Sequence, residues 1–427
     1  MTDKQKQLLI QTGLFLVTIV TTTIAGAEWI YGKFVLWVPE SLLMTWDDFL
    51  SGFQFSVPFL LILTCHEFGH YFTARYHKIN VTLPYYIPMW LGFILAPSFG
   101  TMGAFIKIKD QIYSLKHYFD VGISGPLAGF LIALGVIGYG YATLPAPEQI
   151  FEIHPEYEQY GLDYPEHVYT YEFSKHMDSL AYSRMRAADS VAFIDENREG
   201  DWYYRDFKPQ LSYTNMYFGK PLLYRLIEKY LMPEDAFVPR KEEIMHNPFL
   251  LAGLLAMFFT ALNLLPIGQL DGGHITFGLF GAKNHRIISR VLFTAFIFYA
   301  GLGVITINDL TDVGLESSLE FIVIILAYVY FLFVSTRSMF TEKRNRWLFA
   351  TVLFTLQFLL SSFLSIEGYS GWLLFALLLG RVLGLDHPPV LDHRPLNMPR
   401  KALGWFAIIV FILCFSPEPL VIETILP

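Results

Sequence analysis

Long apolar runs alternate with short polar loops along most of the chain. Runs of about 17 to 25 apolar residues are long enough to cross a bilayer as a helix. The runs lie near residues 8–28, 55–76, 120–143, 247–267, 287–307, 318–335, 347–366, 370–384 and 402–421. The pattern predicts an all-α polytopic membrane protein with about nine transmembrane helices, of which the eighth is short.

The charges in the loops orient these predicted helices. The loops on one side carry the basic residues Lys4, Lys6, Arg75, Lys78, Lys107, Lys109, Lys116, Lys283, Arg286, Arg290, Arg337, Lys343, Arg344, Arg346, Arg394, Arg400 and Lys401. The loops on the other side carry the acidic residues Glu40, Asp47, Asp48, Asp309, Asp312, Glu316 and Glu367. Because cytoplasmic loops are enriched in Lys and Arg, the basic side is predicted to be cytoplasmic. The first run is longer than the core of a usual signal peptide, so we expect a retained helix rather than a cleaved one.

Residues 83–109 are apolar but do not fit a continuous helix. Pro84, Pro88 and Pro97 interrupt them, and prolines break helices. Ala104 to Lys109 then alternates apolar and polar side chains, as a strand does. We predict a re-entrant β-hairpin that dips into the cytoplasmic leaflet, where its backbone must be satisfied by protein or water. Its open edge could pair with an extended peptide, or the segment could be a structural plug; the sequence leaves both open.

Residues 144–246 are polar, acidic and rich in tyrosine. The charge pattern places them outside the cytoplasm, as an extracytoplasmic insert between two groups of helices. Phe218 to Ile227 is predicted to begin an amphipathic helix on the bilayer surface. A filter for substrate size and an inert cap fit the composition of the insert equally well.

The overall composition supports a membrane protein and excludes one class of partner. Of 427 residues, 54% are hydrophobic and 16% charged, and the formal net charge is −8. An acidic chain lacks the basic footprint that nucleic-acid binding needs, so we expect no nucleic-acid partner. Cys65 and Cys414 both fall in apolar runs, which excludes a disulfide framework and disfavours a thiolate metal site.

The second apolar run contains a metal-binding pattern. His66 and His70 are four residues apart, so on a helix both imidazoles lie on one face and can bind a single zinc ion. Glu67 between them can reach a water on that ion and act as general base. The spacing therefore predicts a hydrolytic zinc site inside a membrane-spanning helix.

Asp271 is the best candidate for a third protein ligand. It follows the fourth run, at the membrane face to which the second run delivers His66 and His70. A carboxylate there is costly unless it is paired or bound to metal. Pro266 and the Gly272-Gly273 pair should unwind the chain around it. Asn263, shortly before, could hold a substrate carbonyl or could join two helices by a hydrogen bond.

A second histidine cluster has a plainer interpretation. His387 and His393 lie among prolines, in the segment Asp386-His387-Pro388-Pro389 and the residues that follow. Prolines at this spacing indicate a turn, so we interpret both histidines as parts of a cytoplasmic surface loop rather than as a second metal site.

The motifs together resemble the site-2 protease family of intramembrane zinc metalloproteases. The resemblance rests on His66-Glu67-Phe68-Gly69-His70, on Asn263 to Gly273, and on Gly125-Pro126-Leu127-Ala128-Gly129. It implies one zinc ion per chain on His66, His70 and Asp271, with Glu67 as the catalytic base. The substrate-binding residues that we expect are Asn263, Ala104, Phe105, Ile106, Gly125 and Pro126.

The chain also departs from the family pattern. Gly268 stands where many members have a second proline, which suggests a looser local backbone. Many bacterial members carry a PDZ domain in place of residues 144–246, but no carboxylate-binding loop of that kind is recognisable here. The helices after the core are not required by the family core either.

These observations predict five segments. They are an N-terminal helix with its external loop (1–53), the first half of a protease core (54–143), the insert (144–246), the second half of the core (247–285) and C-terminal helices (286–427). The predicted function is hydrolysis of a peptide bond within the transmembrane segment of another membrane protein. A membrane metal-ion or proton transporter and a catalytically silent scaffold are the alternatives.

The predicted location is the plasma membrane of a prokaryote, with the active site near the cytoplasmic leaflet. The expected partners are the lipid bilayer and transmembrane protein substrates. The sequence leaves the oligomeric state open.

Overall fold

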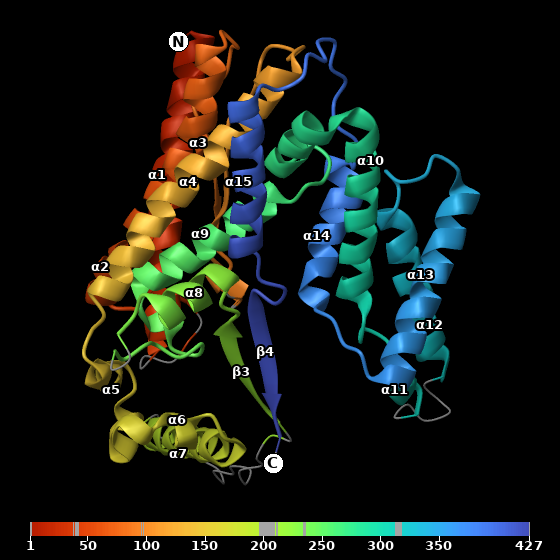
Figure 1. Ribbon diagram of the computed structural model, residues 1–427. Coiled ribbons are helices and arrows are strands. Elements are labelled where there is room, and N and C mark those ends of the chain that lie inside the picture. The colour runs from red at the N-terminus through yellow and green to blue at the C-terminus, as the bar shows by residue number, and fades with distance from the viewer. Residues whose placement is uncertain are drawn as a thin grey trace.

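The computed structural model is mostly helical and contains two small antiparallel sheets (Figure 1). It describes residues 2–36, 38, 42–94, 96, 98–195, 210, 212–233, 236–311 and 318–426. Three of the predicted acidic loop residues, Glu40, Asp312 and Glu316, lie outside the described part of the chain, as does Pro97.

Every predicted span overlaps a described helix. These helices are α1 (Asp3–Tyr31), α3 (Phe53–Tyr76), α4 (Leu115–Ala142), α9 (Pro248–Leu264), α10 (Asp271–Gly301), α12 (Ser318–Ser335), α13 (Lys343–Leu364), α14 (Leu373–Leu377) with the π-helix Leu378–Leu383, and α15 (Met398–Cys414). Among the described residues, four helical segments are long and apolar enough to cross a membrane: Asp3–Tyr31, Trp46–Tyr76, Leu115–Ala142 and Lys343–Leu364. About nine crossings therefore stay a prediction.

Short elements connect these helices. They are α2 (Trp46–Ser51), the 3₁₀ turn Gly92–Ile94, α11 (Ile307–Thr311) and the 3₁₀ turn Ser370–Trp372. Helix α10 is bent at Gly281, whose φ of 77° interrupts the helical backbone.

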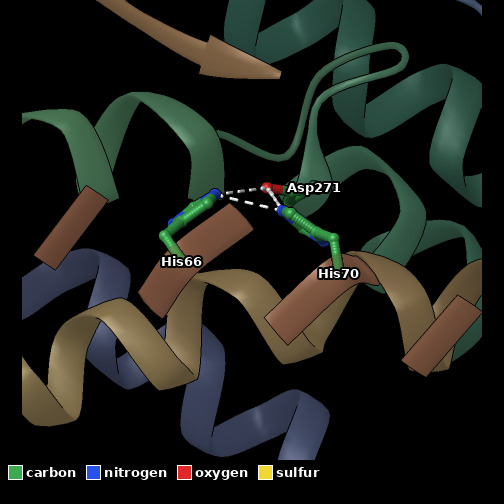
Figure 2. A group of neighbouring side chains, drawn as sticks. All are labelled: His66, His70 and Asp271. Atoms are coloured by element: carbon green, nitrogen blue, oxygen red, sulfur yellow. Dashed lines mark hydrogen bonds and ion pairs between the residues drawn. The ribbon is translucent and has the colours of Figure 1, made fainter. Parts of the chain in front are cut away.

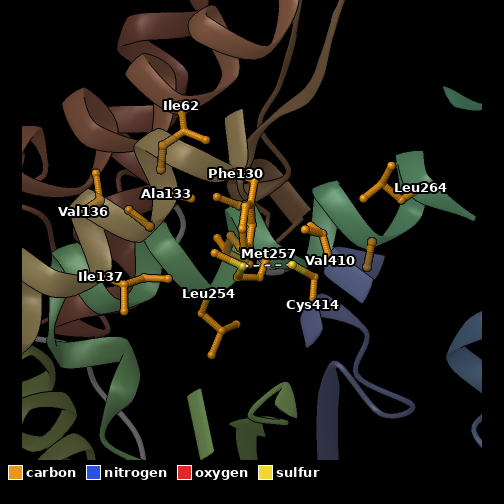
Figure 3. Close-up of a cluster of buried hydrophobic side chains, with 14 of the residues drawn as sticks. Ile62, Phe130, Ala133, Val136, Ile137, Leu254, Met257, Leu264, Val410 and Cys414 are labelled. Carbon is orange, nitrogen blue, oxygen red and sulfur yellow. Dashed lines mark hydrogen bonds between the residues drawn. The ribbon is translucent and has the colours of Figure 1, made fainter. Parts of the chain in front are cut away.

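Two apolar clusters hold the helices together. The first joins α1, α3, α4, α9 and α15, and Figure 3 shows its centre around Met257. Here the Cys414 sulfur lies 3.1 Å from the Met257 sulfur, so this cysteine is a buried packing residue, as its apolar run indicated. The second cluster joins α10, α12, α13 and α14. Because α15 returns to the first cluster, the C-terminal helices close back on the core.

The predicted hairpin is present, but its second strand begins earlier than expected. Strands β1 (Tyr85–Met89) and β2 (Gly100–Phe105) pair antiparallel. The alternation from Ala104 to Lys109 predicted a later strand, and this boundary was wrong. After Phe105 the pairing continues only irregularly, through a bridge between Val81 and Ile108. Pro84 explains the interruption, since proline has no N–H for the ladder.

Helix α1 supports the hairpin along its length. The Gln11 side-chain amide donates to the Leu83 carbonyl over 2.6 Å, and the Thr21 hydroxyl donates to the Gly100 carbonyl over 2.7 Å. A Cβ at Gly100 would lie 2.3 Å from the Cα of Thr22, so the strand lies directly against the helix. The hairpin therefore has a fixed position between α1 and α3.

The insert is built from short helices and one strand. They are the 3₁₀ turn Pro147–Gln149, α5 (Ile150–Ile153), the 3₁₀ segment Pro155–Asp163, α6 (Pro165–Val168), α7 (Tyr171–Asp195), β3 (Tyr213–Phe218), α8 (Leu222–Tyr230) and the 3₁₀ turn Ile244–His246. The predicted amphipathic helix is α8, although Phe218 ends a strand and the helix begins at Leu222. Tyr224 of α8 is fully buried, and its hydroxyl donates to the Leu250 carbonyl over 2.7 Å. Packing against α9 therefore fixes α8.

The C-terminus adds a strand that the apolar pattern did not reveal. Residues 402–421 read as one span, but α15 ends at Cys414 and Leu420–Ile425 forms β4. Pro417 and Pro419 explain the break, because a proline cannot continue a helix. Strand β4 pairs antiparallel with β3 of the insert, with Asn215 opposite Glu423. The insert and the C-terminus therefore lie on the same side of the helices (Figure 1).

This pairing predicts a specific cross-link. Asn215→Cys combined with Glu423→Cys should form an intramolecular disulfide under mild oxidation, because facing strand residues lie within disulfide range. The disulfide is measured as the loss of two maleimide-reactive thiols, which are counted on a gel. The pair Asn215→Cys and Glu418→Cys is the control and should stay reduced. Equal oxidation of both pairs would contradict the β3–β4 register.

Candidate metal centre

The two histidines of α3 and the aspartate of α10 converge on one point. His66 and His70 are buried on one face of α3, and their Nε2 atoms lie 3.1 Å apart. An Asp271 carboxylate oxygen lies 3.6 Å from His66 Nε2 and 3.3 Å from His70 Nε2. Figure 2 shows the three side chains pointing toward one another. In the described part of the chain, no other group of three such side chains is placed to hold a metal ion.

The spacing of these atoms fits tetrahedral zinc. Ligand bonds of about 2.0 to 2.1 Å at tetrahedral angles put neighbouring donor atoms about 3.3 Å apart. The three observed separations, 3.1, 3.3 and 3.6 Å, lie around that value. Two imidazoles and one carboxylate are also a donor set typical of catalytic zinc, with the fourth position left open. The residues therefore fit a hydrolytic zinc ion.

A backbone contact sets the orientation of His70. Its Nδ1 lies 2.7 Å from the Val121 carbonyl of α4. A carbonyl only accepts hydrogen bonds, so Nδ1 carries the proton and Nε2 keeps a lone pair for the metal. The ring occupies space that a side chain on α4 would need, since a Cβ at Gly125 would lie 2.1 Å from His70 Nε2. Gly125 thus makes room for a ligand.

The third ligand is positioned by a break between two helices. Helix α9 ends at Leu264, just before Pro266, and Asp271 begins α10. The predicted unwinding is therefore confirmed at Pro266, but it was wrong for Gly272 and Gly273, which lie inside the first turn of α10. A carboxylate in the first turn of a helix also interacts favourably with the helix dipole.

Gly268 has a definite structural role in this break. Its φ is +58°, which proline cannot adopt because its ring holds φ near −65°. A Cβ at Gly268 would lie 2.1 Å from the Gly384 carbonyl. The expectation of a looser backbone was therefore wrong, since the C-terminal part of the chain packs directly on this glycine.

Glu67 and Asn263 lie beside the three ligand atoms. A Glu67 carboxylate oxygen lies 4.0 Å from His66 Nε2, and the Asn263 amide nitrogen lies 3.3 Å from the same atom. Both side chains line a cavity of about 300 Å³ together with the three ligands. Glu67 is close enough to exchange a proton with a water held among the ligands.

The hairpin forms one wall of this cavity. Ala104, Phe105 and Ile106 line it, and the Ile106 backbone lies near the Glu67 carboxylate. Gly125 and Pro126 lie in α4, and among the described residues neither lines the cavity. Contact of all these residues with a substrate stays a prediction.

The sequence interpretation missed one pair of residues next to the site. His274, one turn after Asp271, lines the cavity, and its Nδ1 lies 2.8 Å from His387 Nε2. His387 is partly buried and stacks on Phe277 with ring centroids 3.8 Å apart. The interpretation of His387 as a surface-loop residue was therefore wrong. The spacing of His274 from Asp271, one helical turn, was the only sequence signal that His274 lies at the site. Nothing in the sequence around His387 indicates that it contacts His274.

Comparison with known proteins identifies the family. The model of peptidase family M50 matches residues 54–307, which is more than half of the chain. The chain belongs to peptidase family M50. The predicted resemblance to site-2 proteases is thereby confirmed. In this M50 chain the match covers α3, the hairpin, α4, the insert, α9 and α10.

The individual relatives of this M50 chain share less than a quarter of the aligned residues in the two matches that follow. It is 23% identical over 222 residues to "Probable zinc metalloprotease EGY1, chloroplastic" of Oryza sativa subsp. japonica, which covers 52% of this chain and 27% of the relative. It is 22% identical over 255 residues to "Probable zinc metalloprotease EGY2, chloroplastic" of Oryza sativa subsp. indica, covering 59% and 34%. The matches thus span about a third of these relatives or less. No solved structure matches the chain. Family membership and the apolar helices together support a membrane metalloprotease.

The close contact at Gly125 yields a prediction about metal content. Gly125→Ala should displace the His70 ring and strongly reduce bound zinc, measured by mass spectrometry of the purified protein. Gly138→Ala in the same helix is the matched control, because a Cβ there meets no atom within 4 Å. Normal zinc in Gly125→Ala, or equal losses in both variants, would show that the helix contact does not orient His70.

Proposed function

We propose that this M50 chain is an intramembrane zinc endopeptidase, with one zinc ion, that cleaves a peptide bond in the membrane-spanning segment of other membrane proteins. The observation that carries the proposal is the placement of His66, His70 and Asp271 around one point with Glu67 beside them. His66, Glu67 and His70 lie on an apolar helical segment, Trp46–Tyr76, that is long enough to span a bilayer. A hydrolytic site at that depth meets its substrates within the membrane.

The residues of the site divide the chemistry between them. His66, His70 and Asp271 would hold zinc, which when bound polarises a carbonyl and activates water. Glu67 takes one proton from the attacking water, and its burial beside the ligands keeps it within reach. The water oxygen bonds to the scissile carbonyl carbon, the C–N bond breaks, and Glu67 delivers the proton to the departing amine. Asn263, at the cavity wall, is placed to hold a substrate carbonyl.

The substrate must be extended where it is cut. A helical segment buries its peptide bonds in hydrogen bonds between successive turns, so it has to unwind locally. The hairpin supports this step, because Ala104 to Ile106 line the cavity beside Glu67, and within the described residues β1 and β2 pair only with each other. The strand edge can then pair with the unwound backbone. Substrates with Gly, Pro or Asn in the segment should be favoured, since these residues weaken helices.

The proposed location follows from charge. Basic residues at one end of the helices assign that end to the cytoplasm, and the ends of α3 and α9 that carry His70 and Asn263 approach it. We therefore place the site near the cytoplasmic leaflet of a prokaryotic plasma membrane. The word "chloroplastic" in the names of the relatives describes the location of those proteins, not of this chain. Cleavage at this depth would release a fragment of the substrate into the cytoplasm.

Two rival functions remain distinguishable by experiment. A metal-ion or proton transporter would use the same intramembrane His and Asp side chains but would not need Glu67 in particular. A silent scaffold would bind membrane partners without cutting them. The contact of Glu67 with both the ligand group and the hairpin favours the protease.

The first prediction concerns the glutamate. Glu67→Gln should lower cleavage by about 10²- to 10⁴-fold, because it removes the general base, while zinc content stays at the wild-type level. Co-expression with a panel of tagged single-span proteins, followed by immunoblotting for a shortened product, measures cleavage. Asp271→Asn is the contrasting variant and should lose both cleavage and zinc. If no protein of the panel is cut by wild type and spared by Glu67→Gln, and the purified wild type holds no stoichiometric zinc, the protease proposal is wrong.

The second prediction concerns orientation. Gln159→Cys in the insert should react with a membrane-impermeant maleimide on intact cells, because the insert is proposed to lie outside. Lys343→Cys, at the start of α13, is the matched control and should react only after the membrane is permeabilised. The reverse pattern would overturn the cytoplasmic location of the site.

A further inference from the structure

Two histidines at the wall of the cavity form a hydrogen-bonded pair. His274 of α10 lines the cavity that holds the ligand group, whereas His387 lies behind it in the loop after the π-helix. The ring of Tyr118 stacks on His274, with centroids 5.0 Å apart, and also meets His387 edge-on. Tyr118 thus packs against both rings, and His274 is the member of the pair that lines the cavity.

The hydrogen bonds of the pair fix which atoms carry protons. His387 Nδ1 lies 2.7 Å from the Pro388 carbonyl, which can only accept, so Nδ1 of a neutral His387 is protonated. Its Nε2 is then an acceptor, and the partner atom, His274 Nδ1, must donate. A neutral His274 that donates through Nδ1 leaves Nε2 without a proton. His274 therefore offers a hydrogen-bond acceptor at the cavity.

The surroundings of His387 keep it neutral. Burial against Phe277, together with the adjacent His274 ring, lowers the pKa of His387 to about 3. At neutral pH the ring is then uncharged, and the direction of the hydrogen bonds holds.

The loop that carries His387 is tied to the ligand segment. The Ser289 hydroxyl donates to the Leu385 carbonyl over 2.8 Å and accepts from the Gly268 N–H over 3.2 Å. At its far end, the Leu115 N–H of α4 donates to the Asp392 carbonyl over 3.0 Å. The loop is therefore held both to the break that positions Asp271 and to the helix that orients His70.

We propose that His387 is a positioning residue of the active site, which holds His274 so that its Nε2 accepts an N–H from the backbone of the extended substrate. This inference rests on the proposed function. It assigns a role in the site to a residue of the C-terminal part, well beyond the family-matched residues 54–307. The acceptor complements the hairpin, because an extended peptide presents N–H groups on both sides.

The test separates positioning from folding and from catalysis. Substrate binding is measured on zinc-loaded, full-length Glu67→Gln protein in detergent, with a fluorescent single-span peptide that has Asn-Pro at its centre as the probe. In this background we compare His387→Leu, which cannot accept from His274, with His387→Gln, whose amide oxygen can. His393→Leu is the matched control, since His393 is an exposed histidine of the same loop.

The expected result is a graded loss. His387→Leu should bind the probe about three- to tenfold more weakly, the effect of one lost hydrogen bond, with unchanged zinc content. His387→Gln should recover most of the affinity, and His393→Leu should match the parent. Four outcomes would each overturn the proposal. They are equal binding by His387→Leu and the parent, binding by His387→Gln that is no stronger than that by His387→Leu, loss of zinc in His387→Leu, and no saturable binding by the parent.

A chemical probe identifies the accepted hydrogen. Peptides methylated at one backbone nitrogen at a time should include one whose binding falls in the parent but not in His274→Leu. No such position would overturn the acceptor role. The outcome is independent of cleavage: binding that meets these criteria would leave the positioning role of His387 standing even if the co-expression and zinc measurements refute the protease proposal.

Discussion

The close approach of α3 and α4 is the constraint on which the site depends. At Gly69 a Cβ would lie 2.6 Å from the Ser124 carbonyl, and at Gly125 it would enter the space of the His70 ring. Small residues let helix backbones come this near in an apolar environment. Only at this separation does His70 reach the Val121 carbonyl, which sets its tautomer and aims its free nitrogen at the ligand group. A polar group so deep among apolar side chains would otherwise be costly.

The third ligand extends this constraint to the C-terminal half of the chain. Asp271 reaches the histidines because the chain leaves α9 at Leu264 and restarts as α10. The intervening turn is stabilised at Gly268 by Gly384 and Ser289, both outside the turn itself. The helices after the family core therefore contribute to the geometry of the site. The return of α15 to the first apolar cluster links the same two halves a second time.

The hairpin shows how a polar backbone is accommodated at the site. Its strands rest on α1 through Gln11 and Thr21, so that part of the backbone is satisfied by side chains of an otherwise apolar helix. The open end of the hairpin, at Ile106, lines the same cavity as Glu67. One element thus connects the N-terminal helix, which precedes the family match, with the residue proposed to move the proton.

The sequence by itself determined the features that depend on local spacing. Helical periodicity placed His66 and His70 on one face, Pro266 ended a helix before Asp271, and the prolines of residues 83–109 excluded a helix there. Tertiary structure alone decided where distant segments meet. The pairing of β3 with β4, the contact of Gly268 with Gly384 and the reach of His387 to His274 join residues more than 100 positions apart. Such contacts arise from how whole helices pack, and a local pattern of apolar and polar residues carries no record of that packing.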